Sequence, residues 1–251
     1  MTISPDPQWA RPFFADRSVL VTGGTSGIGA AIAAGFAGAG ADVVATGATQ
    51  AEVEAAAGRR VLGVAHRLLD VRDGGAVTAL LSSFARLDVV VNCAGIIRRG
   101  DELDPEVFAA VIDVNLTGSM RVCAAARPLL ARTGEGAIIN LASMLTFQGG
   151  GLVPGYSASK GGIGQMTKSL AIAYAADGIR VNAIAPGWIA TPLTEALRSD
   201  PERSGPILSR TALKRWGQPD DIVGGALFLA SPAAAFVTGV ILPIDGGYLA
   251  G

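Results

Sequence analysis

The sequence predicts an α/β protein built on a single doubly wound parallel sheet of seven strands. Two features of the 251-residue chain support this prediction. Short, almost continuously apolar segments alternate with segments of helical spacing from end to end, and glycines follow the first apolar segment where a helix should begin. Strands buried on both faces of a sheet read as unbroken apolar runs, and helical crossovers return parallel strands to one sheet.

The first elements set this pattern. Residues 17–24 are an apolar run that ends in glycines, 27–40 have helical spacing and end at a glycine, 41–47 are again strand-like, and a polar helix is expected over about 50–57. The remaining strands are expected at 60–71, 87–95, 136–144, 179–187 and 240–247.

We find no linker and no internal repeat, so we expect one domain over residues 1–251. The most irregular segment, 188–216, is polar, contains several prolines and follows the sixth strand. Ligands of such sheets bind beyond the carboxyl ends of the strands, so this segment is a candidate substrate lid.

Composition excludes several classes of protein. Half of the residues are hydrophobic and 16% are charged, which argues against disorder, and a net charge of −1 without a basic run does not support nucleic-acid binding. The N-terminus lacks the apolar stretch of a signal peptide, and no apolar run reaches about 18 residues. Cys93 and Cys123 have neither metal-ligand nor disulfide spacing, and His66 is the sole histidine. We expect a cytoplasmic protein with two reduced thiols, no metal and no membrane partner.

The stretch TGGTSGIG at residues 22–29 lies where the first strand gives way to the first helix. Glycines there allow a tight turn and let the backbone approach a pyrophosphate at the helix N-terminus. We therefore expect a Rossmann-type dinucleotide site. The positions expected to contact the dinucleotide are Gly23, Thr25, Ser26, Gly27, Ile28, Gly29, Thr46, Asp70, Val71, Asn92, Ala94 and Gly95.

The choice between NAD and NADP depends on the end of the second strand. An acid there accepts a hydrogen bond from the ribose hydroxyl of NAD, whereas an arginine pairs with the extra phosphate of NADP. This chain has neither at residues 46–49, and Ser26 stands in the glycine turn instead of a basic residue. Because no cation is visible for the phosphate, we favour NAD over NADP.

Tyr156 and Lys160 lie four residues apart among small residues, on one face of an expected helix. A nearby cation favours the phenolate and lowers the pKa of a tyrosine, and oxidised nicotinamide would add a second positive charge. The pair is thus a candidate acid/base for a hydroxyl proton while the nicotinamide exchanges a hydride. Ser143 ends the fifth strand and is placed to hold the substrate oxygen. Asn115 falls in a helix whose distortion could let it hold a water linked to Lys160.

With these motifs in this order, the chain resembles the short-chain dehydrogenase/reductase family over essentially its whole length. The matching features are TGGTSGIG, NCAG at 92–95, the tetrad Asn115, Ser143, Tyr156 and Lys160, and Pro186-Gly187 after the sixth strand. The departure is Cys93, where the family usually has a second Asn. The resemblance implies an active oxidoreductase, usually a homotetramer. It also implies cofactor contacts at Tyr156, Lys160, Pro186, Gly187, Ile189 and Thr191.

A narrower resemblance concerns the substrate. Residues 94–103, 142–162, 181–219 and 245–251 are similar to the 2-deoxy-D-gluconate 3-dehydrogenase group, also described as 2-dehydro-3-deoxy-D-gluconate 5-dehydrogenases. The substrate would then be 2-deoxy-D-gluconate or 2-keto-3-deoxy-D-gluconate, whose carboxylate needs a cation such as Arg98 or Arg99. The substrate contacts that we expect are Arg98, Ser143, Gln148 and Trp188.

Three alternatives remain open at this stage. A 3-oxoacyl-[acyl-carrier-protein] reductase shares the general motifs but would prefer NADPH, for which Ser26 is unfavourable. A gluconate 5-dehydrogenase-like polyol or ketose reductase would share the same site. A nucleotide-sensing binding protein without turnover is a different class, and the filled tetrad argues against it.

Overall fold

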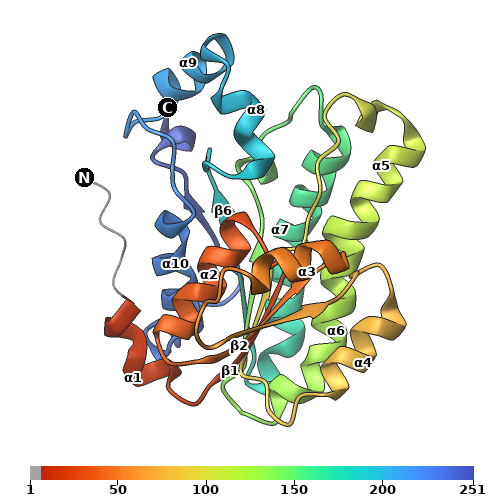
Figure 1. Ribbon diagram of the computed structural model, residues 1–251, viewed down its shortest axis with the longest axis vertical. Coiled ribbons are helices and arrows are strands. Elements are labelled where there is room, and N and C mark those ends of the chain that lie inside the picture. Colours follow the sequence, from red (N-terminus) through yellow and green to blue (C-terminus); the bar gives the residue numbers. More distant parts are fainter. Residues whose placement is uncertain (1–6) are drawn as a thin grey trace.

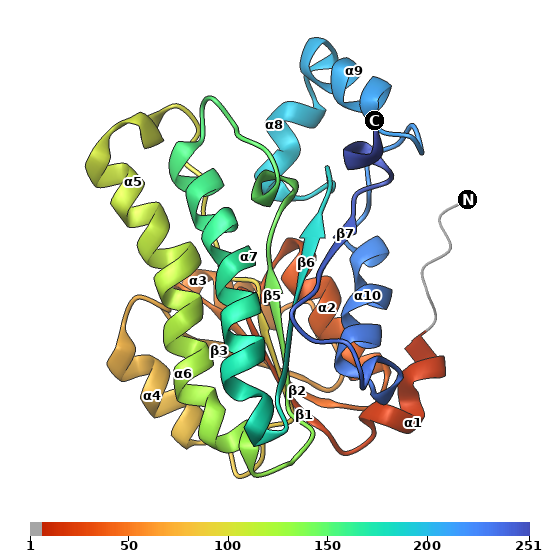
Figure 2. The ribbon, with the colours of Figure 1, turned by 180° about the vertical axis from the view of Figure 1, so that it is seen from behind.

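The computed structural model describes residues 7–251, so residues 1–6 of the expected N-terminal arm lie outside the described residues. Seven parallel strands form one sheet in the order β3-β2-β1-β4-β5-β6-β7 (Figures 1 and 2), which confirms the predicted fold class. The strands are β1 (Ser18–Thr22), β2 (Asp42–Gly47), β3 (Val64–Leu68), β4 (Val89–Asn92), β5 (Ala137–Leu141), β6 (Arg180–Pro186) and β7 (Ile241–Ile244).

Helices cover both faces of this sheet (Figures 1 and 2). The helices α2 and α10 pack on one face, and α4, α6 and α7 pack on the other. Their bounds are α1 (Arg11–Phe14), α2 (Gly27–Gly38), α3 (Gln50–Ala57), α4 (Gly74–Ser82), α5 (Pro105–Ile112), α6 (Gly118–Ala131), α7 (Pro154–Tyr174), α8 (Glu195–Arg198), α9 (Pro201–Arg210) and α10 (Asp220–Ala230).

The strands are apolar on both faces because each face has its own core. In β1, Val19 and Val21 pack with α2 and α10, whereas Leu20 packs with α4 and α6. Val89 and Val90 of β4 divide in the same way. Successive side chains of a strand point to opposite faces, so an unbroken apolar run is what a sheet covered on both sides requires.

The register brings the carboxyl ends of the central strands level. Thr22 of β1 pairs with Asn92 of β4, and Asn92 pairs with Asn140 of β5. The order of the strands reverses between β1 and β4, where open α/β sheets form a crevice beyond the strand ends. The segments that follow β1, β4, β5 and β6 therefore lie together beyond the carboxyl ends of the strands.

The helical stretch Pro105–Ala131 is long and apolar enough to cross a membrane by length and composition, with a mean hydropathy of 1.4. In the fold it is the run α5–α6, interrupted by one π-helical turn, Asp113–Thr117. Its buried residues Val122, Cys123 and Leu130 belong to the core behind the sheet. The stretch is thus a core helix of this α/β fold.

The irregular segment 188–216 after β6 leaves the sheet as a loop with two short helices, which we call the excursion, and backbone hydrogen bonds join its two ends. Ala190 N–H donates to Gly217 O at 2.8 Å, and Gly217 N–H donates to Trp188 O at 2.9 Å. Between these bonds, α8 and α9 rise over the carboxyl ends of the strands (Figure 1).

Candidate active site

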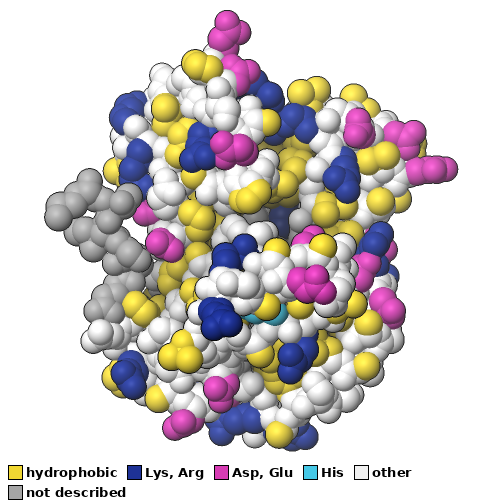
Figure 3. Space-filling view, in the orientation of Figure 1, with side chains coloured by type: hydrophobic (Ala, Val, Ile, Leu, Met, Phe, Trp, Pro, Cys, Tyr) yellow, Lys and Arg dark blue, Asp and Glu magenta, His cyan; other side chains and the backbone are white. Residues whose placement is uncertain are grey.

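A cleft of about 530 Å³ opens beyond the carboxyl ends of the strands. Figure 3 shows the surface hollowed between the lobe of α8 and α9 and the lobe of α5. Most of the residues expected at a dinucleotide site line this cleft: Gly23, Thr25, Ser26, Gly27, Ile28, Gly29, Asp70, Val71, Ala94, Gly95, Pro186, Gly187, Ile189 and Thr191.

The glycine turn has the shape that a pyrophosphate requires. Gly23 has a φ of +63°, and a Cβ there would lie 2.7 Å from the backbone of Ala94. A Cβ at Gly29 would lie 2.2 Å from the carbonyl oxygen of Gly23. The side chain of Ser26, the N-cap of α2, makes no capping bond, so the first amides of this helix remain available to an anion. These residues fit a nicotinamide dinucleotide.

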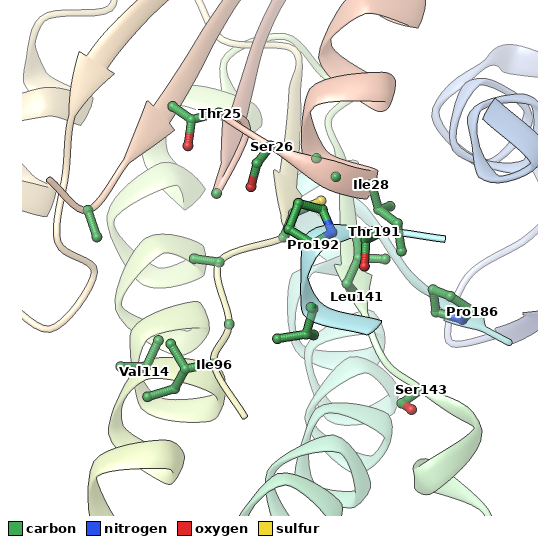
Figure 4. Close-up of a pocket in the computed structure, with 18 of the residues that line it drawn as sticks. Thr25, Ser26, Ile28, Ile96, Val114, Leu141, Ser143, Pro186, Thr191 and Pro192 are labelled. Carbon is green, nitrogen blue, oxygen red and sulfur yellow. The ribbon is translucent and has the colours of Figure 1, made fainter. Parts of the chain in front are cut away.

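The excursion after β6 covers this turn. Thr191 Cγ2 lies 3.4 Å from the position that a Cβ of Gly27 would take. Figure 4 shows Thr191 and Pro192 beside Ile28, while Ser143 stands apart from Thr25 and Ser26. The cleft thus runs from the glycine turn to Ser143, and its middle is bordered by residues from the start of the excursion.

Ser143, Tyr156 and Lys160 all line the cleft. Ser143 follows β5, and its Oγ accepts a hydrogen bond from Leu145 N–H at 3.2 Å. Lys160 Nζ lies 5.5 Å from the centroid of the Tyr156 ring. The helical spacing has therefore placed the tyrosine and the lysine on one face of α7, beside the serine.

Lys160 is held by the backbone of β5. Its Nζ donates to Leu141 O at 2.6 Å, and its own carbonyl accepts from Thr146 Oγ1 at 2.9 Å. Burial lowers the pKa of Lys160 from 10.5 to about 8. The ammonium is thus fixed in a weakly solvated position, where its charge is less favoured than in water.

The pKa of Tyr156 is raised overall, whereas the spacing predicts that Lys160 lowers it. Burial raises the pKa of Tyr156, the hydroxyl of Ser143 acts in the opposite direction, and the negative charge of Glu102 raises the pKa further. The physical reason is that Lys160 points to the carbonyl of Leu141 while the tyrosine lies in a poorly solvated wall.

Asn115 lies in the predicted helix distortion, a single π-helical turn, but not in the cleft wall. Its Oδ1 accepts from Ile96 N–H at 2.8 Å, and its Nδ2 donates to Ile96 O at 3.0 Å and to Ser159 Oγ at 3.1 Å. The side chain braces the strand-end segment that borders Gly95. Such π-turns occur frequently at functional sites.

Four other expected contact residues lie outside the cleft wall: Thr46, Asn92, Gln148 and Trp188. Thr46 is fully buried, and Asn92 donates to Asn140 Oδ1 at 2.9 Å inside the sheet. Trp188 packs edge-on against Trp216, with ring centroids 5.8 Å apart. Thr46 precedes the last residue of β2, and Asn92 is the last residue of β4. Successive side chains of a strand point to opposite faces, and these two are buried in the sheet instead of lining the cleft.

Sequence reasoning missed several residues of the wall, among them Glu52, Arg72 and Cys93. Glu52 has a visible signal, the spacing Thr49-x-x-Glu52 of a capping box, and the structure forms both of its bonds. Burial raises the pKa of the Cys93 thiol to about 12. Arg72 is tied to Asp70 by an ion pair at 2.6 Å.

Comparisons with known proteins agree with this geometry. A family model described as "Enoyl-(Acyl carrier protein) reductase" matches residues 23–249. The chain belongs to the short-chain dehydrogenase/reductase family, and it is an NAD(P)-dependent oxidoreductase with a Rossmann-type fold.

Particular relatives point to sugar acids. The chain is 44% identical to a 2-dehydro-3-deoxy-D-gluconate 5-dehydrogenase of Pseudoalteromonas atlantica, over 93% of this chain and 96% of the relative. A crystal structure of a candidate 2-deoxy-D-gluconate 3-dehydrogenase from Agrobacterium tumefaciens, with bound NADP, is 44% identical. It covers 96% of this chain and 99% of its own, with a TM-score of 0.86.

A third similar protein is a candidate NAD(P)-dependent gluconate 5-dehydrogenase from Beutenbergia cavernae, with NADP bound at low occupancy. Its structure is 40% identical, covers 94% of this chain and 98% of its own, and has a TM-score of 0.87. The narrower resemblance seen in the sequence thus has counterparts among both relatives and structures.

Proposed function

We propose that this chain oxidises a secondary hydroxyl of a deoxy sugar acid, 2-deoxy-D-gluconate or 2-keto-3-deoxy-D-gluconate. The observation that carries the proposal is that Arg98 lines the same cleft as Ser143 and Tyr156. Within residues 7–251 no carboxylate forms an ion pair with Arg98. An unpaired guanidinium beside an acid/base suits a substrate that carries both a carboxylate and a hydroxyl.

The catalytic roles follow from position. The Ser143 hydroxyl would hold the substrate oxygen, the Tyr156 hydroxyl would receive or return its proton, and Lys160 would keep a positive charge beside the ring. Bound NAD(P) supplies the hydride acceptor or donor. Asn115 would act by bracing the segment at Ile96. Direct contacts of Gln148 and Trp188 with substrate stay predictions.

We also propose that NAD is preferred, although the two structures compared above bind NADP. Glu52 Oε2 accepts from Ala48 N–H at 2.8 Å and from Thr49 N–H at 3.4 Å. These amides at the start of α3 would otherwise suit a phosphate. A carboxylate already on them repels the extra phosphate of NADP and leaves an acceptor for the ribose hydroxyl of NAD.

An opposing group lies nearby. The guanidinium of Arg59 donates to the carbonyl oxygen of Thr25 in the glycine turn, where it could also meet a phosphate. Fluorescence titration with NADH and NADPH decides between the two. We expect NADH to bind more tightly than NADPH. We expect Glu52→Gln to reduce the ratio of the two affinities about tenfold or more, because a neighbouring charge shifts an equilibrium of this kind by about 1–3 pKa units, and each unit is a factor of ten.

The matched control is Glu54→Gln, which removes the same charge two residues further along α3, where Glu54 accepts a hydrogen bond from Gln50. It should leave both affinities unchanged. Tighter binding of NADPH than of NADH by the unaltered chain would contradict the proposed preference.

The substrate is tested by following NADH absorbance with purified protein. NAD and NADP are compared with 2-deoxy-D-gluconate, 2-keto-3-deoxy-D-gluconate, D-gluconate and, in the reducing direction, acetoacetyl-CoA. We expect NAD-linked oxidation of a deoxy sugar acid and a KM raised about tenfold or more in Arg98→Met, but not in Arg67→Met on the far strand β3. NADPH-linked reduction of acetoacetyl-CoA alone would exclude the sugar-acid proposal.

A second candidate is gluconate 5-dehydrogenase activity, favoured by the similarity to the Beutenbergia cavernae structure. Faster turnover of D-gluconate than of both deoxy acids would select it. We further propose a cytoplasmic homotetramer in which the excursion at 188–216 acts as a lid over the bound substrate.

A further inference from the structure

The buried carboxylate of Glu102 has no role in the reaction described so far. Glu102 is 1% exposed and lies in a 3₁₀ turn, Asp101–Leu103, after the segment that carries Arg98. No described basic residue forms an ion pair with it. Charged side chains are rarely buried so completely without a partner, and here the partners are backbone amides.

Each oxygen of this carboxylate holds one amide. Oε1 accepts from Arg98 N–H at 2.7 Å, and Oε2 accepts from Tyr156 N–H, also at 2.7 Å. The second bond caps α7 from outside, because the N-cap of α7, Val153, has no polar side chain and Pro154 follows it. The carboxylate therefore joins the segment of the expected substrate anchor to the first turn of the catalytic helix.

The surrounding backbone is shaped for this contact. A Cβ at Gly155 would lie 3.3 Å from Glu102 Oε2, so a glycine leaves room for the carboxylate. Gly100 N–H donates to Leu152 O at 2.7 Å, which ties the same two segments together a second time.

We propose that Glu102 is a positioning residue that sets the place of Tyr156 relative to Arg98. The importance given to Arg98 rests on the proposed function. A hydroxyl and a carboxylate of one substrate must meet the tyrosine and the arginine together, and a shift of about 1 Å between such groups can lower the rate 10²-fold.

The same contact affects the proton chemistry of Tyr156. Four groups face the tyrosine or its lysine: Lys160 on α7, Ser143 after β5, Cys93 after β4 and Glu102. Among these, the negative charge of Glu102 raises the pKa of Tyr156. Removing that charge should therefore let the phenolate form at a lower pH.

The test compares Glu102→Gln with Glu102→Asp. Glutamine cannot accept from both amides, because one of its two terminal atoms is itself a donor, and it also removes the charge. Aspartate keeps the charge but withdraws it by one methylene. We expect kcat to fall about tenfold or more in both variants, while the dissociation constant of NADH stays within about twofold, since the dinucleotide turn lies elsewhere.

Tyrosinate absorbance gives a readout that needs no substrate. The chain has three tyrosines, and subtracting the titration of a Tyr156→Phe background isolates Tyr156. We expect its midpoint to move to lower pH in Glu102→Gln and to stay near the unaltered value in Glu102→Asp. Asp101→Asn, which removes an exposed charge one residue away, is the control and should shift neither kcat nor the midpoint.

An unchanged kcat in both Glu102 variants would overturn the positioning role, and so would a midpoint shift of equal size in Asp101→Asn. If the unaltered chain turned over no sugar acid, the proposed function would fail, whereas the tyrosinate midpoints would still test the contact between Glu102 and Tyr156.

Discussion

At the scale of single residues, the buried charge of Lys160 lowers the free energy of unfolding of the protein. Its pKa falls from 10.5 to about 8 through burial. While the ammonium is protonated in both states, this difference costs the folded state about 3 kcal/mol. Between those two pKa values the unfolded chain holds more protons than the folded one, so stability rises with pH through that window.

We therefore predict that Lys160→Met abolishes turnover and stabilises the protein at about pH 7. The gain should be roughly 2 kcal/mol, because the hydrogen bond to Leu141 O is lost with the charge. Urea denaturation across the pH range measures it, and the advantage should shrink as pH rises towards the ordinary pKa of lysine. Lys168→Met, an exposed position on the same helix, should change little. Equal stabilities of Lys160→Met and the unaltered protein at neutral pH would refute this reasoning.

The tyrosine hydroxyl has a separable role. We predict that Tyr156→Phe lowers kcat by about 10²–10⁴-fold, the usual contribution of a positioned acid/base, and leaves NADH binding intact. Tyr174→Phe removes a hydroxyl from the other end of the same helix and should retain activity. Steady-state assays of NADH formation measure kcat, and fluorescence titration measures NADH binding. Substantial residual turnover in Tyr156→Phe would assign the proton transfer to another group.

At the scale of elements, the turn between β1 and α2 depends on the absence of side chains. We predict that Gly23→Ala loses NADH binding and roughly 2 kcal/mol or more of stability, because its φ is +63° and its Cβ would meet the Ala94 backbone at 2.7 Å. Gly74→Ala is the matched control, since nothing lies within 4 Å of its Cβ at the start of α4. Calorimetric unfolding and NADH titration provide the measurements, and normal NADH binding by Gly23→Ala would count against a pyrophosphate at this turn.

Helices and strands were predictable where residues close together in the sequence determine them. The apolar runs predict all seven strands, the bounds of α3 agree with residues 50–57, and the four-residue spacing of Tyr156 and Lys160 places both in the cleft. Glu102 was not predictable, because its bond to Tyr156 N–H joins residues 54 apart in the chain. Asn92 and Trp188 were predicted to contact ligands because they lie next to motifs in the sequence, but they lie outside the cleft wall. Adjacency to a motif does not determine which way a side chain points.

At the scale of the whole molecule, the two edges of the sheet differ. The edge strand β3 carries the charged residue Arg67, and a charged side chain on an edge strand discourages pairing with another chain. The strand β7 forms the other edge of the sheet (Figure 2). It has no charged residue, and its side chains are only partly buried. Apolar strands of this kind are usually covered.

We predict that a second copy covers the β7 edge and that the protein is a tetramer of its 25.3 kDa chain in solution. Phe236, which precedes β7, is fully exposed at 106%, and Phe228 and Val240 near it in sequence are also exposed. Burying such side chains stabilises an interface by about 1.5–3 kcal/mol each, so Phe236→Ser should reduce the mass measured by light scattering. Leu62→Ser removes an apolar side chain of similar exposure, 95%, beside the charged β3 edge and should leave the mass unchanged. A monomeric mass for the unaltered protein would contradict the prediction, and a loss of mass in Leu62→Ser alone would move the interface to the opposite edge.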